Sequence, residues 1–225
     1  MQGSTKIFPA RTEARLSSAL DIPSFPQTTQ NIDYEVASDG FLFLLPDPVT
    51  PFQRASYSQT QVFRLQPGAS ILMVDWFTSG RISRGEVWAF SEYRSINEIW
   101  SGGKRLARDA LLLESDSSPP DSRSPIPPRT LKDKLGIYDC YATVMLYGPL
   151  IQATIQSLKS SFDNITVMQQ SRPPRLIWSF SLLEGVAVVR VAAEETAMVR
   201  NWLKESLIGV AEVVGKDAYG HAFPA

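Results

Sequence analysis

The run ILMVDWFT at residues 71–78 is the feature that most constrains how this chain can fold. Large apolar residues of this kind favour sheets, so the run predicts a buried β-strand, as does the run FLFLL at residues 41–45. A charged residue, Asp75, lies inside the longer run, and a buried charge needs a partner. We therefore expect a sheet in which Asp75 pairs with Arg81 or Arg84, and in which burial shifts the pKa of the Asp75 carboxyl.

Further strands are expected on the carboxyl side of this run. A glycine-bounded loop at residues 80–85 is followed by EVWAFSEY, residues 86–93, which alternates between two faces. The segments SINEIW and RLARDALLL are separated by Ser-Gly-Gly-Lys at residues 101–104, which is a composition typical of a hairpin turn. Together these segments predict a meander of antiparallel strands.

Residues 114–130, ESDSSPPDSRSPIPPRT, interrupt the strand pattern. Serine and proline make up 10 of the 17 residues. Such a segment buries too little apolar area to offset the entropy of ordering, and its prolines cannot join a strand ladder. We expect a disordered surface insertion here.

The last third of the chain combines strands with two helices. Residues 139–147 predict a strand that ends at Gly-Pro, and residues 176–183 and 186–192 predict two more around a Glu-Gly turn. Helical spacing predicts one helix with an apolar face of Ile151, Ile155, Leu158 and Phe162. A second helix is expected from Glu194, with Glu194 and Glu195 in its first turn and an apolar stripe of Val199, Trp202, Leu203, Leu207 and Val210. Many short strands in series suit a sandwich, a barrel or an irregular coil of sheet.

Composition excludes several classes of function. The 22 basic and 23 acidic residues give a formal charge of -1, so no general attraction to nucleic acid or an anionic membrane is expected. One cysteine, Cys140, and one histidine, His221, leave few ligands for a transition metal, so a self-contained metal site is not expected. Cys140 is expected to be a buried apolar filler. Because no apolar stretch approaches the length of a membrane span, we expect a soluble, cytoplasmic protein.

The sequence offers little for catalysis. A serine hydrolase needs a base beside its nucleophile, and Ser79 lacks the Gly-x-Ser-x-Gly frame, while His221 is the only imidazole. The Ser-Gly-Gly-Lys segment lacks the remaining elements of a phosphate loop. Arg81 and Arg84 could hold an anion or a carboxylate of a partner, or one of them could pair internally with Glu86; the residues leave these alternatives open.

Several ordered motifs together resemble one known family. The segment LLPDPVTPFQRASYSQTQVFRL, residues 44–65, is followed by ILMVDWFTSGRISRGEVWAFSEYRSINEI, and the chain also contains GSTKIF near its start and VAVVRVAAEETAMVRNWL at residues 186–203. Taken in their order along the chain, these segments are similar to the UreD family of urease accessory proteins, in its fungal or plant form. The family pattern "DW-x-TSGR-x-x-x-GE-x-W" is matched by Asp75, Trp76, Thr78, Ser79, Gly80, Arg81, Gly85, Glu86 and Trp88.

The resemblance implies a mainly β fold, a β-helix-like stack of short, mostly antiparallel strands with two α-helices near the carboxyl end. It implies a single domain over residues 1–225, in which the strands that the family carries ahead of the GSTKIF segment are missing. It also implies a scaffold without catalytic residues that binds the urease apoprotein with UreF-like and UreG-like (GTPase) partners. Such a scaffold would help to insert nickel, which is expected as a transferred ion rather than a tightly bound cofactor.

The resemblance points to candidate site residues in the motif. The expected partner-binding or tunnel-lining residues are Asp75, Thr78, Ser79, Arg81, Arg84, Glu86 and Trp88. Asp75 and Glu86 are weak candidates for contact with the metal, and no dedicated metal ligand set is expected. Two alternatives remain: a β-rich protein-interaction module unrelated to urease, and a small hydrolase that uses Ser79 or His221.

Overall fold

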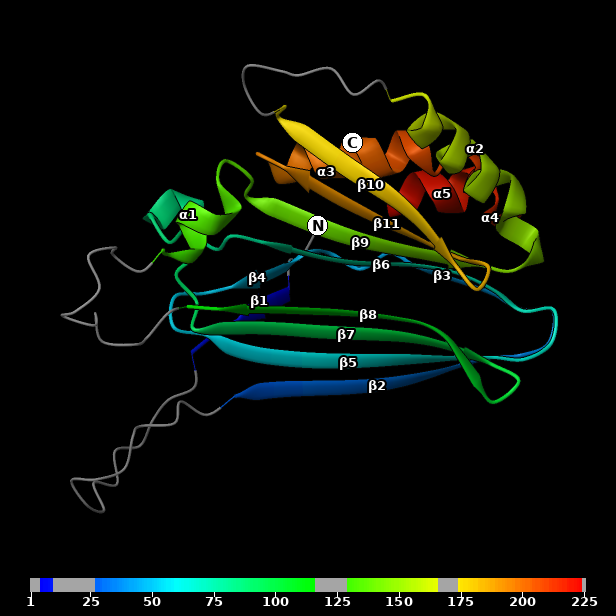
Figure 1. The fold of residues 1–225 in the computed structure, drawn as a ribbon, viewed down its shortest axis with the longest axis horizontal. Helices are drawn as coiled ribbons and strands as arrows, with labels where there is room; N and C mark the ends of the chain where they lie inside the picture. The colour runs from blue at the N-terminus through cyan, green and yellow to red at the C-terminus, as the bar shows by residue number, and fades with distance from the viewer. Residues whose placement is uncertain (1–4, 10–26, 116–128, 166–173, 224–225) are drawn as a thin grey trace, which may run out of the picture.

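Two stacked β-sheets and a layer of helices form the molecule, as the computed structural model in Figure 1 shows. The structure describes residues 5–9, 27–115, 129–165 and 174–223. Sheet A has the strand order β1-β4-β6-β9-β11-β10, with β3 also paired to β6, and sheet B has the order β2-β5-β7-β8. The strands are β1 (Thr5–Ile7), β2 (Thr28–Val36), β3 (Phe41–Leu44), β4 (Val49–Pro51), β5 (Ser56–Leu65), β6 (Ser70–Thr78), β7 (Glu92–Ser101), β8 (Lys104–Glu114), β9 (Cys140–Tyr147), β10 (Leu176–Leu183) and β11 (Val186–Ala193).

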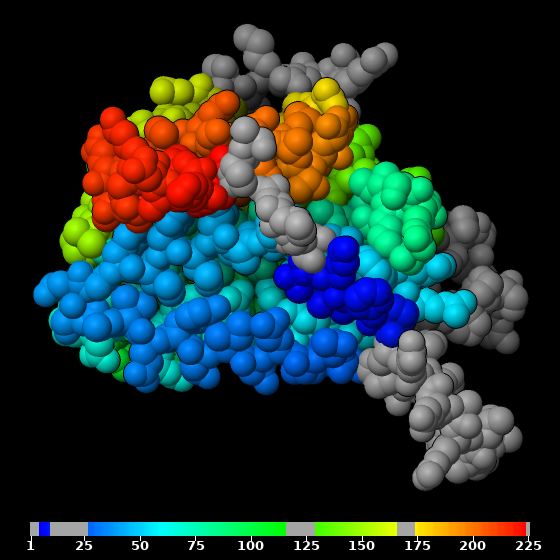
Figure 2. Space-filling view, turned by 180° about the vertical axis from the view of Figure 1, so that it is seen from behind, coloured from blue at the N-terminus to red at the C-terminus, as the bar shows by residue number. Residues whose placement is uncertain are grey.

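The helices that follow β9 cover the outer face of sheet A, whereas the short helix before β9 lies at one end of the sandwich (Figure 1). Seen from behind, the surface of β1 and β2 lies below the surface of the last helix (Figure 2). The helices are α1 (Leu131–Leu135), α2 (Gln152–Asp163), α3 (Thr196–Ser206), α4 (Ala211–Val214) and α5 (Lys216–Ala222), with short 3-10 turns η1 (Ile82–Arg84), η2 (Pro149–Ile151) and η3 (Ile208–Val210). Within the described residues, none of the helices has the length and apolar character needed to cross a bilayer.

The chain crosses repeatedly between the two sheets. It passes from β2 in sheet B to β3 and β4 in sheet A, returns to sheet B in β5, and crosses again in β6 and β7. Strands reached in this way run parallel to their neighbours, as β2 does to β5 and β5 to β7. The later strands β9, β10 and β11 pair antiparallel, so sheet A is mixed.

The predicted mainly β class is confirmed, with helices near the carboxyl end. The expectation of mostly antiparallel strands holds for the β7–β8 hairpin and for β6-β9-β11-β10, but it is wrong for β1–β4, β3–β6, β4–β6, β2–β5 and β5–β7, which are parallel. The reason is the repeated crossing, which a hairpin-by-hairpin interpretation of the sequence misses. A β-helix is not established by this arrangement.

The predicted meander through residues 86–93 is wrong. The segment before Glu92 is irregular, and β6 and β7 lie in opposite sheets. Trp88 has a φ of 54°, outside the range of a strand, and its backbone N–H donates to the carbonyl of Ser79. The segment therefore folds back against the end of β6 and places the Trp88 and Phe90 rings in an aromatic cluster with Phe77 and Tyr93.

The two predicted helices are present, with a difference at the start of the second. Helix α3 begins at Thr196, so Glu194 and Glu195 precede its first turn. Both carboxylates bind Arg175 instead, with Arg175 Nε to Glu194 Oε2 at 2.6 Å and Arg175 Nη2 to Glu195 Oε1 at 2.7 Å. Most of the predicted insertion, residues 116–128, lies outside the described residues; Glu114 ends β8, and Thr130 caps α1.

The core has two levels, one on each face of sheet A. The outer level joins alternate residues of β6, β9 and β11 to the helices, through residues such as Val144 and Leu203. The inner level lies between the sheets and includes Phe63, Met73 and Met145. Successive side chains of a strand point to opposite faces of the sheet, and both faces of sheet A pack against apolar residues. This explains the continuous apolar runs in the sequence of its strands.

Truncating Leu203 should therefore destabilise the whole protein. Its side chain is fully buried between α3 and sheet A, so Leu203→Ala is expected to lower the free energy of unfolding by about 2–5 kcal/mol. Leu182→Ala is the control, because Leu182 is 54% exposed, and it should change stability by less than about 0.5 kcal/mol. Urea denaturation measures both. Equal losses in the two variants would contradict this packing.

Candidate functional site

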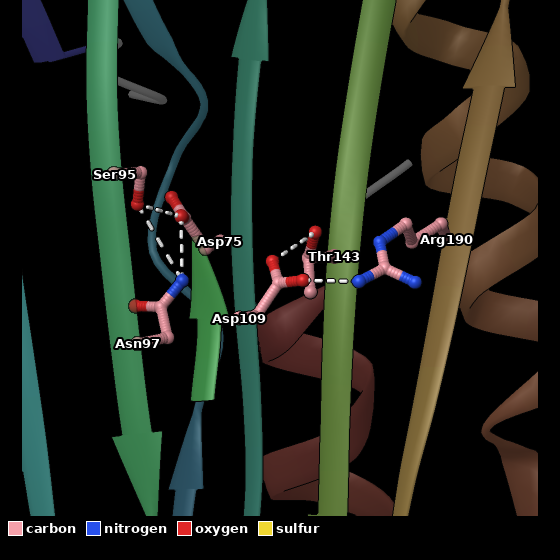
Figure 3. A network of polar contacts seen from close by, with 6 residues as sticks. All are labelled: Asp75, Ser95, Asn97, Asp109, Thr143 and Arg190. Atoms are coloured by element: carbon pink, nitrogen blue, oxygen red, sulfur yellow. Dashed lines mark hydrogen bonds and ion pairs between the residues drawn. The ribbon is translucent and has the colours of Figure 1, made fainter. Parts of the chain in front are cut away.

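A cluster of polar side chains lies buried between the two sheets, where an apolar core would be expected. We define this polar layer as Gln59 and Gln61 of β5, Ser95 and Asn97 of β7, Asp75 of β6 and Asp109 of β8. All six residues are at most 8% exposed. Figure 3 shows four of them between the sheets, with Thr143 and Arg190 beside them. Buried polar groups are costly unless hydrogen-bonded, so this layer must satisfy itself.

The alternation of side chains along each strand determines where the residues of the polar layer lie. On β5, Gln59 and Gln61 share the inward face with Tyr57 and Phe63, since alternate residues point the same way. The parallel register of β5 and β7 sets Gln59 opposite Ser95 and Gln61 opposite Asn97. Sheet A faces these pairs with Asp75.

The carboxylate of Asp75 is the end point of the hydrogen bonds. Gln59 Nε2 donates to Oδ1 at 2.7 Å, and Oδ2 accepts from the Ser95 hydroxyl and from Asn97 Nδ2 at 2.9 Å. Gln61 Nε2 donates in turn to Asn97 Oδ1 at 3.1 Å, so Gln61 is connected to Asp75 through Asn97. An ionised carboxylate can only accept hydrogen bonds. Here three side-chain donors from sheet B bind the single Asp75 carboxyl group of sheet A.

The expected pairing of Asp75 with an arginine is wrong. Within the described residues, Asp75 has no basic partner, and its hydrogen bonds come from neutral groups. Burial raises the pKa of the Asp75 carboxyl, the bonds from Ser95, Asn97 and Gln59 oppose the rise, and the nearby charge of Asp109 adds to it. The site therefore holds a carboxyl group that three neutral donors solvate and that, within the described residues, has no counter-ion.

The loop at residues 80–86, which we call the arginine loop, is a separate feature. Arg81 forms a two-pronged ion pair with Glu86, through Nε at 2.8 Å to Oε2 and through Nη2 to Oε1, so the internal pairing that the sequence left open is present. This bond lowers the pKa of Glu86. The Arg81 guanidinium also lies 4.0 Å from the centre of the Phe52 ring, and Arg84 is exposed in η1. No hydrogen bond among the described residues joins this loop to Asp75.

The remaining candidates, at and beyond the end of β6, are buried. Thr78 Oγ1 bonds Thr50 Oγ1 at 3.1 Å, Trp88 is buried, and Ser79 is fully buried. Gly80 has a φ of 127°, and a Cβ there would lie 2.6 Å from the Glu86 carbonyl oxygen, so the tight fold of the loop requires glycine. The structure therefore brings Thr78, Ser79, Arg81, Glu86 and Trp88 together at one end of the sandwich, apart from the layer around Asp75.

The residues considered for catalysis do not meet. Ser79 is enclosed at the end of β6, while His221 is exposed in α5 over the other face of sheet A, and no hydrogen bond links them. Cys140 is fully buried, as predicted, and burial raises the pKa of its thiol to about 12. Among the described residues there is no group of three His, Cys, Asp or Glu side chains that could hold a metal ion.

Five of the six residues of the polar layer were not predicted from the sequence: Gln59, Gln61, Ser95, Asn97 and Asp109. Their signal was the period-two pattern on β5, in which glutamines occupy the same face as Tyr57 and Phe63. Polar residues on an apolar face indicate a buried network, but only the crossing of the chain between sheets shows that they face Asp75.

Fold and site together define a two-sheet β protein that buries a hydrogen-bonded polar layer around an unpaired carboxylate. A model of the family described as "UreD urease accessory protein" matches residues 1–221. The chain belongs to this family.

Relatives in fungi and plants agree with this assignment. Urease accessory protein 4 of Cryptococcus neoformans is 36% identical over 234 residues, which cover 97% of this chain and 71% of the relative. Urease accessory protein D of Oryza sativa subsp. indica is 36% identical over 145 residues, covering 64% of this chain and 44% of the relative. Urease accessory protein D of Arabidopsis thaliana is 30% identical over 212 residues, covering 84% of this chain and 69% of the relative.

The raised pKa of Asp75 predicts a specific pH dependence. The folded state holds this proton more tightly than the unfolded chain, whose Asp pKa has the ordinary value of 3.8. The stabilising contribution of Asp75 is thus complete below pH 3.8 and is lost as the pH rises through the folded-state pKa. Relative to Asp75→Asn, the free energy of unfolding of the wild type should fall from acid toward neutral pH.

Urea denaturation at a series of pH values measures this difference. Asp33→Asn is the control for the change in protein charge, because the Asp33 side chain is 63% exposed. A difference between the wild type and Asp75→Asn that is constant with pH would show that burial does not raise the pKa of this carboxyl.

Proposed function

We propose that this chain is a non-catalytic scaffold for urease maturation in the cytoplasm. In this proposal it binds the urease apoprotein together with UreF-like and UreG-like partners and assists the insertion of nickel. The observation that carries the proposal is the match to the UreD urease accessory protein family over residues 1–221. The urease accessory proteins of fungi and plants that resemble this chain support it.

The polar layer suits passage of nickel as cargo. Its side chains offer carboxyl, amide and hydroxyl oxygens from both sheets, and Asp75 supplies a buried carboxyl group that has no cationic partner among the described residues. Oxygen ligands hold a divalent transition metal less tightly than thiolates or imidazoles do, and a transfer route needs weak binding. We propose that Ni²⁺ contacts Asp75 and the neighbouring oxygens of the layer in transit.

The arginine loop suits partner docking. Arg84 and Ile82 are exposed in η1, and Ile82 is 52% exposed, while the Arg81–Glu86 ion pair fixes the base of the loop. Arginine beside exposed apolar surface is typical of protein interfaces. In this proposal Arg81, Glu86 and Trp88 shape the loop, and Arg84 contacts the partner.

The alternative of a β-rich interaction module unrelated to urease makes a different prediction for association. A pull-down with the full chain as bait, in the presence of GTP and Ni²⁺, should capture urease and the UreF-like and UreG-like proteins. Failure to capture any of them would leave the unrelated module as the better account.

Deletion of the gene tests the maturation role directly. The strain should contain urease protein that is nickel-poor and inactive, because the apoprotein is made but not loaded. Urease activity, immunoblotting and metal analysis of the purified urease measure the three quantities. Fully active urease in the deletion strain would refute the proposal.

Complementation of that strain tests the part played by Asp75. Asp75→Asn keeps the shape of the side chain but removes its charge, so it should lower the nickel content and activity of urease at equal amounts of accessory protein. Asp33→Asn is the control, because it removes an exposed carboxylate on β2. Full activity with Asp75→Asn would show that maturation does not use this charge.

A further inference from the structure

A cavity of about 300 Å³ opens at the side of the sandwich where sheet B ends. Sheet B ends at β8, whereas sheet A continues past β9 to β11 and β10. The walls of the cavity come from these strands and are mostly apolar and aromatic, with Phe77, Leu111, Tyr141, Ile177 and Trp178 among the lining residues. Asp109, Thr143 and Arg190 also line it, so the cavity has a polar side next to the polar layer.

Asp109 belongs to both the cavity and the layer. Its side chain is 8% exposed, and it lies opposite Asn97 in the register of β7 and β8, next to the residue that donates to Asp75. Its carboxylate binds the guanidinium of Arg190 through Oδ1 and accepts from the Thr143 hydroxyl through Oδ2 at 3.3 Å. Figure 3 shows this ion pair beside the Asp75 cluster. Among the six residues of the polar layer, Asp109 is the one that also lines the cavity.

The two partners of this ion pair differ in exposure. The Arg190 side chain is 54% exposed, while that of Asp109 is 8% exposed. A guanidinium at the surface can turn into water at small cost, but a buried carboxylate that loses its partner is strongly disfavoured. The bond can therefore open readily only if another cation takes the place of Arg190 on Asp109.

The charges of the layer make this exchange favourable. The layer contains two carboxylates, Asp75 and Asp109, and within the described residues Arg190 is the one basic side chain that bonds to it. A divalent cation would balance both negative charges, whereas the guanidinium balances one.

We propose that Arg190 is a gating residue, an exchangeable counter-ion that closes the lateral opening of the polar layer until a divalent cation displaces it from Asp109. This proposal rests on the proposed function, because it takes Ni²⁺ to be the cation that passes. No bond other than the ion pair breaks: the guanidinium turns outward with its charge, and the metal ion takes its place on the Asp109 oxygens. Competition by Arg190 also keeps the affinity low enough for the ion to leave again.

The experiment measures binding of Ni²⁺ to the isolated full chain by equilibrium dialysis. Arg190→Ala should bind Ni²⁺ roughly ten-fold more tightly than the wild type, since the variant lacks the contacting cation that competes with Ni²⁺ for the Asp109 carboxylate. Arg190→Lys keeps a competing cation and should restore affinity near the wild-type value. The matched control is Arg64→Ala, which removes an arginine of similar exposure from the Arg64–Asp33 ion pair between two neighbouring strands of sheet B.

Second variants keep the test decisive. Arg190→Gln removes the charge but retains a donor for Asp109, and it replaces Arg190→Ala if that variant does not fold. Adding Asp109→Asn to either should abolish the gain in affinity. Affinity unchanged by loss of the arginine charge, including no binding in any variant, would overturn the gate.

The same variants separate this proposal from the proposed function. In the complemented deletion strain, Arg190→Ala should give less active urease than Arg64→Ala does, because the ion is held too long. If the wild-type gene restores urease but Arg190→Ala alters neither affinity nor activation, the gate is wrong and the maturation role stands. If the wild-type gene is not needed for urease, the maturation role fails, while the dialysis result still decides the gate.

Discussion

The carboxylate of Asp75 is the constraint on which the two-sheet arrangement depends. The Asp75 side chain extends from β6 of sheet A and accepts hydrogen bonds from Gln59 on β5 and from Ser95 and Asn97 on β7 of sheet B. These bonds are possible only if β5 and β7 pair in one register and if both lie over β6. A slip of one residue would turn the polar side chains outward and leave the carboxylate unsolvated, so a single buried charge specifies how the sheets stack.

This constraint also explains why the interior can serve function. An apolar core would stabilise the fold as well as or better than buried polar groups, so a layer of this kind needs another reason. The chain solvates Asp75 with neutral donors but gives Asp109 a cationic partner, Arg190, at the open side. Within the described residues, the carboxyl group deep between the sheets thus has no cationic partner, whereas the one at the edge has one. That difference suits the proposed passage of a divalent cation in a urease accessory protein of the UreD family.

Local sequence patterns predicted the strands and helices better than they predicted the contacts between them. The apolar run of β6, the Gly-Gly turn of the β7–β8 hairpin and the helical spacing of α2 and α3 carry their structure within a few residues. Strand direction and the partner of Asp75 depend on crossings between sheets, which no short segment contains. The interpretation of Trp88 as part of a strand failed because tertiary packing of its ring and the hydrogen bond to Ser79 hold it at a positive φ. The expected partner of Asp75 was also wrong, because Arg81 pairs with its neighbour Glu86. Asp75 instead accepts hydrogen bonds from Gln59, Ser95 and Asn97, which are 16 to 22 residues away in the sequence.

In our proposal a divalent cation occupies the space between the sheets at the polar layer. Crystals of the full chain, soaked with Ni²⁺ and measured on both sides of the nickel absorption edge, test this. We expect an anomalous peak beside the carboxyl groups of Asp75 and Asp109, with the Arg190 side chain turned away. Nickel found only on the outer surface, for example at the exposed His221, with the Asp109–Arg190 ion pair intact, would contradict it.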